Sequence, residues 1–327
     1  MEILITGGAG FIGSKLCANL LQTGVLVSAQ GPQTISRITI LDQSQVALPA
    51  DERLLSLVGN ASDPEDLRRA LSPNTAVVFH LASVVSVAAE QDFSLGYDVN
   101  LSGTLALLEL CRTLSRPPLF IMASSAAVYG GPLPDSVNET TALFPQTSYG
   151  TQKAIAELLV SDYTRKGFVQ GRCLRLPTIV VRPGKPNLAA SSFASSLVRE
   201  PLMGRNYECP VPPTTKVCLL SVRRVVGGFV HAASLSAEDL GHTTAVQLPG
   251  LTLTVQDILG ALSDVAGQSV AQRVSFVPNA HIIEIVRGWP ARFSAERATA
   301  LGFQEETSAQ EIIAGFVKDE LQGNIAR

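Results

Sequence analysis

The sequence predicts an α/β protein built on a doubly wound parallel sheet. Three observations support this prediction. Short apolar, β-branched segments recur through the first 180 residues. Segments with helical spacing separate most of these strand-like segments. A glycine-rich turn follows the first strand-like segment. The strand segments are apolar throughout, as in strands covered on both faces. With 327 residues and 46% hydrophobic content, the chain can fill a sizeable core.

The expected elements alternate up to about residue 180. Strands are expected at 2–6, 37–41, 54–58, 76–82, 119–124 and 172–181. Helices are expected at 15–24, 64–71, 100–114 and 148–167, and further along at 222–235 and 254–267, with a strand at 245–248. We therefore expect a sheet domain over residues 1–180, completed by parts of 217–250, and a smaller, interleaved C-terminal portion over 181–327.

Composition excludes several classes of protein. The 25 basic and 28 acidic residues give a net charge of -3 without a basic stripe, so we expect no nucleic-acid partner. The five cysteines and four histidines are scattered along the chain, so we expect no metal site. We also expect the thiols to be reduced and mostly buried, as in a cytoplasmic protein. The N-terminus leads directly into a strand, and the most apolar stretch, 76–89, is too short to span a bilayer. We expect neither a signal peptide nor a membrane partner.

The glycine-rich turn TGGAGFIG, at 6–13, lies between the first strand and the first helix. Gly7 permits a tight turn, Gly10 lets backbone N–H groups approach a pyrophosphate, and Gly13 allows close packing of helix on sheet. This context predicts a dinucleotide site. The turn nominates five cofactor contacts, namely Gly7, Gly10, Phe11, Ile12 and Gly13.

An acid ends the second strand of the predicted sheet. The carboxylate of Asp42 can accept hydrogen bonds from ribose hydroxyls and would repel a 2′-phosphate, and neither Arg nor Lys occurs in the QSQ that follows. The cofactor expected is NAD rather than NADP. The alternative is a surface acid, because an extra segment at 28–36 changes the usual spacing of the first crossover.

A candidate catalytic set follows the fifth strand. Tyr149 and Lys153 are four residues apart in an expected helix and so share one face. A nearby ammonium favours the phenolate of a tyrosine, whose free pKa is ~10, so Tyr149 is the candidate general base. Ser125 ends the strand, where its hydroxyl can orient a substrate oxygen. Its neighbour Ser124 is expected to be structural.

Together these motifs resemble the extended short-chain dehydrogenase/reductase family, which contains the NAD-dependent epimerases and dehydratases. Its glycine motif, acid, serine and Tyr-x-x-x-Lys pair match the residues above. The resemblance implies a Rossmann-type fold, hydride transfer to or from NAD, a ribose contact for Lys153, and a homodimer. Further cofactor contacts implied by it are Asn60, Ala61, Leu81, Ala82, Ser83, Asn100, Tyr149, Lys153 and Pro177.

The sequence departs from the nucleotide-sugar enzymes of that family. They usually carry LR-x-x-N after the sixth strand, whereas LRLPT places Thr178 at the asparagine position. Dehydratases place acids beside the catalytic hydroxyl residue, but Ala126 and Ala127 follow Ser125. An epimerase with tightly bound NAD stays open as an alternative. A non-catalytic redox sensor is disfavoured, since it would need neither Tyr149 nor Lys153.

A closer resemblance, over 147–202 and 285–303, is to the dehydrogenases of this family that oxidise the 2-hydroxyl of D-erythronate to 2-oxo-tetronate. It implies a small sugar acid as substrate. Such a molecule needs a cation for its carboxylate and several hydrogen-bond partners for its hydroxyls. Lys185 and Arg199 could supply such groups in addition to the contacts named below. The alternative is that Arg182 and Lys185 are solvated turn residues that do not contact substrate. Trp289 is expected to lie in a core or an interface. The nominated substrate contacts are Ser125, Tyr149, Thr178, Arg182, Asn187, Ser191 and Ser192.

Overall fold

The computed structural model describes residues 1–184 and 191–326. A seven-stranded sheet organises the first part of the molecule, in the order β12-β8-β7-β6-β1-β4-β5, and every neighbouring pair in it is parallel. This confirms the predicted doubly wound fold. The strands are β1 (Glu2–Thr6), β4 (Arg37–Asp42), β5 (Leu54–Val58), β6 (Thr75–His80), β7 (Leu119–Ser125), β8 (Gln170–Leu176) and β12 (Ala245–Gln247).

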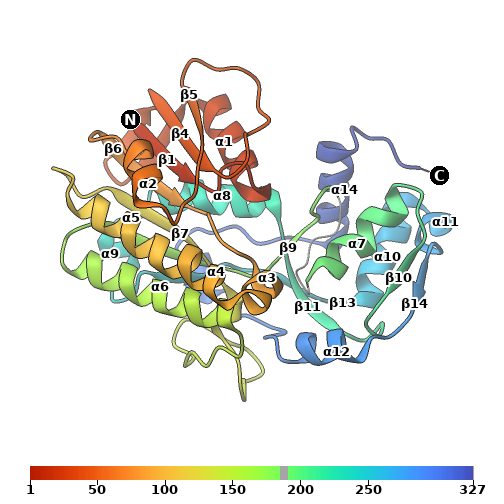
Figure 1. Cartoon of the computed structure of the whole chain (residues 1–327). Coiled ribbons are helices and arrows are strands. Elements are labelled where there is room, and N and C mark those ends of the chain that lie inside the picture. The colour runs from red at the N-terminus through yellow and green to blue at the C-terminus, as the bar shows by residue number, and fades with distance from the viewer. Residues whose placement is uncertain (185–190, 327) are drawn as a thin grey trace.

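Helices cover both faces of this sheet (Figure 1). Alternate residues of β1 explain the two layers, because Ile3 and Ile5 pack into one apolar cluster and Leu4 into another. The first cluster holds α1 (Phe11–Thr23) and α8 (Val222–Ala232) on the sheet. The second holds α2 (Pro64–Ala70), α5 (Gly103–Arg112) and α6 (Ser148–Arg165).

Two stretches differ from the sequence prediction. The single strand expected at 172–181 is two strands, because Pro177, which has no N–H for a ladder, separates β8 from β9 (Thr178–Val180). β9 pairs with β11 in another sheet. The extra crossover segment forms an antiparallel hairpin of β2 (Val25–Ser28) and β3 (Gly31–Thr34).

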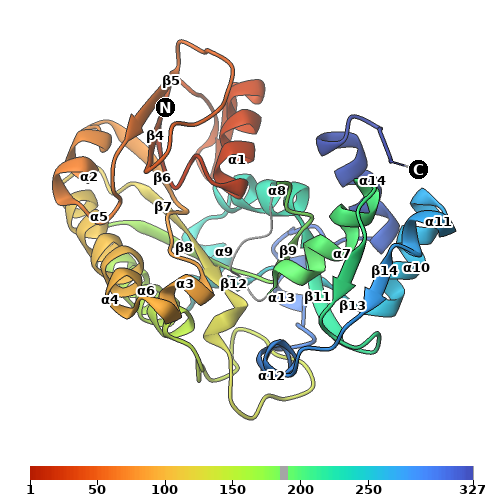
Figure 2. The ribbon, with the colours of Figure 1, turned by 45° about the vertical axis from the view of Figure 1, so that its right-hand side comes forward.

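The second part of the molecule has a core of its own, in which Phe193, Leu197, Ile258 and Ile313 are buried together. Figure 2 shows it beside the large sheet, connected through β9 and β11. Its strands are β9, β11 (Lys216–Ser221) and β13 (Leu251–Thr254) in one sheet, and β10 (Tyr207–Cys209) and β14 (Val274–Phe276) in another. Its helices are α7 (Ser192–Leu202), α10 (Val255–Ala266), α11 (Gln268–Ala271), α12 (Ala280–Arg287) and α14 (Ala309–Glu320).

After β11 the chain returns to the large sheet, where it forms α8 and β12, and it then enters the second part again at β13. The helix expected at 100–114 begins as a π turn, η1 (Asp98–Ser102), and continues as α5. The remaining elements are α3 (Ser86–Gln91), α4 (Phe93–Tyr97), η1 (Asp98–Ser102), η2 (Ala126–Val128), α9 (Ala237–Leu240) and α13 (Glu296–Ala300).

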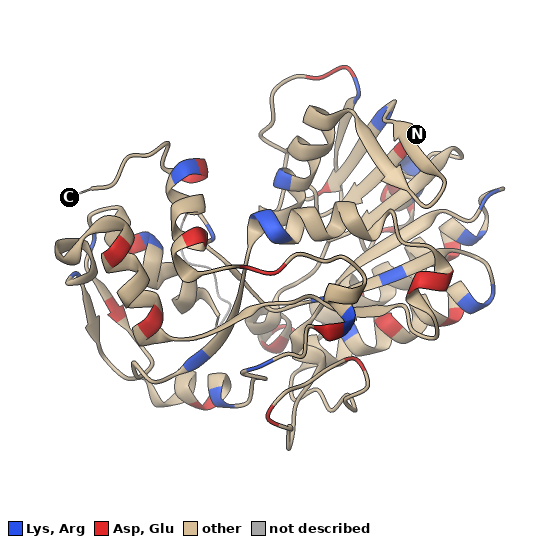
Figure 3. Cartoon of the chain, turned by 180° about the vertical axis from the view of Figure 1, so that it is seen from behind, with Lys and Arg blue, Asp and Glu red and all other residues tan. Residues whose placement is uncertain are grey.

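The structure shows where the charged side chains and the cysteines lie. Figure 3 shows acidic and basic residues interspersed over both parts of the molecule. All five cysteines are buried and free. Among the described residues, no helix combines the length and the apolar character needed to cross a bilayer.

Candidate active site

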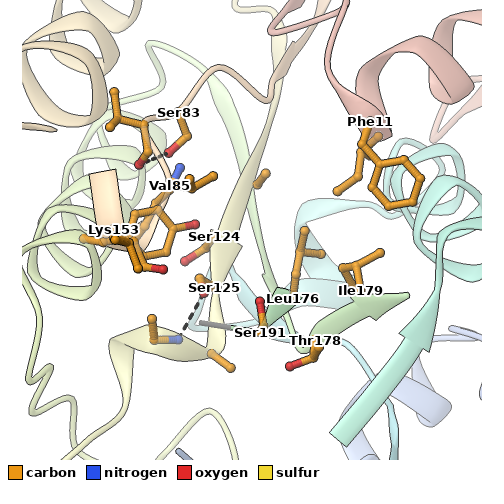
Figure 4. Close-up of a pocket in the computed structure, with 18 of the residues that line it drawn as sticks. Phe11, Ser83, Val85, Ser124, Ser125, Lys153, Leu176, Thr178, Ile179 and Ser191 are labelled. Atoms are coloured by element: carbon orange, nitrogen blue, oxygen red, sulfur yellow. Dashed lines mark hydrogen bonds between the residues drawn. The ribbon is translucent and has the colours of Figure 1, made fainter. Parts of the chain in front are cut away.

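A cavity of about 860 Å³ lies between the two parts of the molecule. Its first wall consists of the β1–α1 turn, the ends of β4, β6 and β7, and the start of α6; its second consists of β9, α7, β11 and α12. The cavity therefore opens at the carboxyl ends of the parallel strands, where doubly wound folds bind their ligands. Figure 4 shows Ser83, Ser125 and Lys153 on one side of this space and Phe11 on the other.

The glycine turn has the tight packing of a dinucleotide cradle. Gly7 has a φ of 72°, and a Cβ there would lie 2.6 Å from the backbone nitrogen of Ala82. A Cβ on Gly13 would lie 2.3 Å from the carbonyl oxygen of Gly7. Larger residues would push the turn away from the sheet, so backbone N–H groups can face a pyrophosphate only with glycine at these positions. All five predicted turn residues line the cavity, namely Gly7, Gly10, Phe11, Ile12 and Gly13.

The carboxylate of Asp42 is positioned beside that turn. Its Oδ2 accepts a hydrogen bond from the backbone nitrogen of Ala9 at 3.0 Å, and its Oδ1 accepts one from that of Ser44 at 3.0 Å. Each carboxylate oxygen has a second lone pair, so both can still accept from ribose hydroxyls. Asp42 lines the cavity together with Asn60 and Ala61. The residues present therefore fit an adenine dinucleotide.

The turn after β6 is held from behind. Leu81, Ala82 and Ser83 line the cavity. The Oδ1 of Asn100 accepts from Ser83 Oγ and from the Val84 backbone nitrogen, both at 2.8 Å, and its Nδ2 donates to the Val84 carbonyl at 3.0 Å. Asn100 is 1% exposed and is not among the described residues that line the cavity. The structure thus gives Asn100 a supporting position behind the turn, and its cofactor contact stays a prediction.

His80, to which the sequence assigned no catalytic part, is a core residue. Its Nδ1 lies 2.7 Å from Thr6 Oγ1 and its Nε2 lies 2.8 Å from Thr104 Oγ1. Burial, together with the positive charge of Lys153, lowers the pKa of His80 to about 3. The imidazole is therefore neutral near pH 7.

Ser125, Tyr149 and Lys153 converge on the cavity. Ser125 ends β7, and its Oγ accepts a hydrogen bond from the Ala127 backbone nitrogen at 3.1 Å, which orients the hydroxyl. Helix α6 begins after Thr147, whose hydroxyl accepts from the Gly150 backbone nitrogen at 3.1 Å. This cap places the tyrosine in the first turn, with the ammonium of Lys153 5.8 Å from its ring centroid.

Electrostatics at this site fit proton transfer. Burial raises the pKa of Tyr149, while the hydroxyls of Ser125 and Ser83 oppose that rise. Burial lowers the pKa of Lys153 to about 8, against the opposing effects of Cys173 and Glu157. The phenol is therefore protonated at rest and must lose its proton before it can act as a base. The adjacent ammonium favours the phenolate that this loss produces.

Replacing Lys153 with methionine is expected to stabilise the cofactor-free protein at pH 7. The folded-state pKa of about 8 lies below the ordinary 10.5, so the buried charge destabilises the fold at pH 7. That cost disappears as the pH rises from 8 to 10.5. The variant should gain about 1–3 kcal/mol in free energy of unfolding at pH 7 and less at pH 10. Urea denaturation at both pH values measures this, with Lys166→Met as control; an equal loss of stability at both would contradict it.

Behind the catalytic set lies a buried ion pair that sequence reasoning missed. Arg175 Nη2 is 2.6 Å from Glu157 Oε2, and both side chains are 5% exposed. The same carboxylate accepts from Ser124 Oγ, and Arg175 Nη1 donates to Tyr129 Oη at 2.8 Å. These contacts tie α6 to the ends of β7 and β8. The only sequence signal was the position of Glu157, four residues beyond Lys153.

The second wall brings together part of the predicted substrate set. Thr178, Arg182, Ser191 and Ser192 line the cavity, as does Pro177. The predicted contact Asn187 lies outside the described residues, as does Lys185. Arg199 is wrong as a substrate group, because it is fully buried and donates to Ser196, to Glu200 and to the carbonyl of Arg182.

The cavity also contains residues that sequence reasoning missed. Lys216, at the start of β11, and His281, on α12, both line the second wall. Trp289 packs against the second core, as expected, and also lines the cavity. These residues are distant in sequence from the catalytic motifs, and no local pattern marks them.

Most of the chain matches one family of known proteins. Residues 3–236 match the model described as the NAD dependent epimerase/dehydratase family. The chain belongs to this family. The glycine turn, the acid at the end of β4 and the Ser125, Tyr149 and Lys153 set all lie within the matched residues.

Relatives in this family cover nearly the whole chain. D-erythronate dehydrogenase from Cupriavidus necator is 52% identical over 319 residues, covering 98% of each chain. D-erythronate dehydrogenase from Haemophilus influenzae is 40% identical over 98% of this chain and 100% of its own. A solved structure from Agrobacterium tumefaciens, described as a nucleoside-diphosphate-sugar epimerase, superposes with a TM-score of 0.92 at 40% identity, over 99% of this chain and 95% of that one.

Proposed function

We propose that this protein is an NAD-dependent dehydrogenase that oxidises the 2-hydroxyl of D-erythronate to 2-oxo-tetronate. The observation that carries the proposal is similarity over 98% of the chain to two relatives named D-erythronate dehydrogenase. The cavity supports it, because a hydroxyl, a phenol and an ammonium stand between a dinucleotide cradle and a small polar wall. Asp42 favours NAD over NADP, since its carboxylate would repel a 2′-phosphate.

The chain's residues supply the acid–base part of the oxidation. Lys153 favours the phenolate form of Tyr149, and this phenolate accepts the proton of the substrate hydroxyl and becomes the neutral phenol. Ser125 donates to the substrate oxygen and stabilises the charge that develops on it. When bound, NAD supplies the acceptor for the hydride that leaves carbon 2. The hydroxyls of Thr178, Ser191 and Ser192 provide partners for the remaining polar groups of a short acid.

A nucleotide-sugar epimerase is the second candidate, favoured by the likeness to the Agrobacterium tumefaciens structure. Such an enzyme would retain NAD through purification and convert a nucleotide sugar without net reduction of the cofactor. Against it, Thr178 occupies the position at which those enzymes usually carry asparagine.

Initial rates over a small substrate panel test the proposal. The panel contains D-erythronate, its carbon-2 epimer, a five-carbon acid, erythritol and UDP-glucose, each with NAD and with NADP. Formation of reduced nicotinamide is expected with D-erythronate and NAD, and none with erythritol, which lacks the carboxylate. Absence of reduction with every acid, together with epimerisation of UDP-glucose, would replace the proposal by the second candidate.

We also propose a second copy of this chain as the protein's partner. Apolar side chains are unusually exposed on α4, α5 and α6, where Phe93 is 59% and Leu158 is 67% exposed, with Leu95 and Leu105 also exposed. Covering such side chains against a second copy would remove them from water.

A further inference from the structure

We propose that Arg182 binds the pyrophosphate of the dinucleotide, and that its guanidinium is not the group that holds the substrate carboxylate. The inference rests on the proposed use of NAD, but not on the identity of the substrate. It revises the substrate role that the sequence suggested for Arg182.

The position of the guanidinium is the first observation. Its Cζ lies 5.4 Å from the centroid of the Phe11 ring. Phe11 is the first residue of α1 and directly follows Gly10, so the arginine stacks on the glycine turn itself. Both residues line the cavity. An anion bound at the N-terminus of α1 would therefore lie between the backbone N–H groups of the turn and the guanidinium.

The backbone of Arg182 is held in place by α7. Its nitrogen donates to Ser195 Oγ at 3.0 Å, and its carbonyl accepts from Arg199 Nη1 at 2.7 Å. Arg199 is itself fixed, since its Nη2 donates to Ser196 Oγ at 2.9 Å. The second part of the molecule thus presents a cation to the glycine turn of the first part from a constrained backbone.

The charge of Arg182 has no counter-ion in the described part of the chain. The nearest acid on α7, Glu200, is already paired with Arg199 at 2.7 Å and with Arg205 at 2.5 Å. Burial and the positive charge of Arg199 both lower the pKa of Arg182. An anion bound beside this half-buried guanidinium would offset both effects. The planar donors of arginine match the oxygens of a phosphate group, and a pyrophosphate is the anion that this fold binds at the glycine turn.

Another cation is available for the substrate. Lys216 lies on β11, whose Leu219 pairs with Thr178 at the start of β9, and it lines the same cavity. Lys216 is therefore assigned to the carboxylate of the acid, while Arg182 serves the cofactor. Removing the charge of Arg182 should therefore weaken cofactor binding, whereas removing the charge of Lys216 should weaken substrate binding.

Binding of cofactor fragments to the Arg182→Met variant tests the assignment without requiring turnover. Calorimetry should show affinity for ADP-ribose reduced by about 10- to 100-fold, because one charge-assisted contact is lost. Affinity for adenosine, which carries no phosphate, should be unchanged. Arg182→Lys, which keeps the charge but loses the planar fork, should fall between Arg182→Met and the wild-type protein.

Lys216→Met is the matched control in the same cavity. It should bind ADP-ribose as the wild type does and raise the KM for D-erythronate. Unchanged ADP-ribose affinity in a folded Arg182→Met protein, or an equal loss of adenosine binding, would overturn the assignment. Failure of D-erythronate turnover would contradict the proposed substrate but leave the ADP-ribose comparison intact.

Discussion

Replacing Tyr149 with phenylalanine is expected to lower kcat by about 10²–10⁴-fold, the range contributed by a positioned general base. The phenol stands beside the Lys153 ammonium and the Ser125 hydroxyl, and the variant removes only the oxygen that takes the substrate proton. Affinity for NAD should persist, because the glycine turn and Asp42 are untouched. Steady-state rates and fluorescence titration with reduced cofactor measure the two quantities separately.

The same helix offers a control for this substitution. Tyr163 lies on α6 outside the cavity, and its hydroxyl donates to Glu109. Tyr163→Phe removes the same atom and should leave kcat near the wild-type value. Turnover by Tyr149→Phe within tenfold of the wild type would exclude the tyrosine as base.

Replacing Glu157 with glutamine is expected to have the largest effect on stability, at about 3–5 kcal/mol in the free energy of unfolding. The substitution leaves the Arg175 guanidinium buried without its counter-charge, although three hydrogen bonds had joined the two side chains. It also removes the carboxylate that accepts from Ser124, the neighbour of the candidate catalytic residue Ser125. Urea denaturation measures the loss.

Removing both charges provides the control. Replacing a buried pair with apolar side chains of similar volume is often neutral, since both desolvation costs disappear together. Glu157→Leu with Arg175→Met should therefore recover most of the stability lost in the single variant. A cost below about 1 kcal/mol for Glu157→Gln would show that the pair is not the main bond between α6 and β8.

Local patterns in the sequence were enough to predict which residues line the cavity at the strand ends. The glycines of the turn, the acid ending β4, and the spacing of Tyr149 and Lys153 each depend on a few consecutive residues whose backbone geometry is set locally. A strand followed by a glycine turn and a helix leaves little freedom in where its N–H groups point. The doubly wound fold followed from the same alternation of strands and helices.

Residue spacing alone did not reveal which side chains meet across the cavity. The break at Pro177 sends β9 to a second sheet, and the pairing of β9 with β11 brings Lys216 to the wall. Folding also turned Asn100 behind the wall, buried Arg199, and stacked Arg182 on Phe11. The sequence by itself thus determined the fold and the position of the candidate acid–base residues, because these rest on local geometry. Only the tertiary structure decided that Arg182 lies over Phe11 and that Lys216 lines the same cavity, because those contacts join segments far apart in the chain.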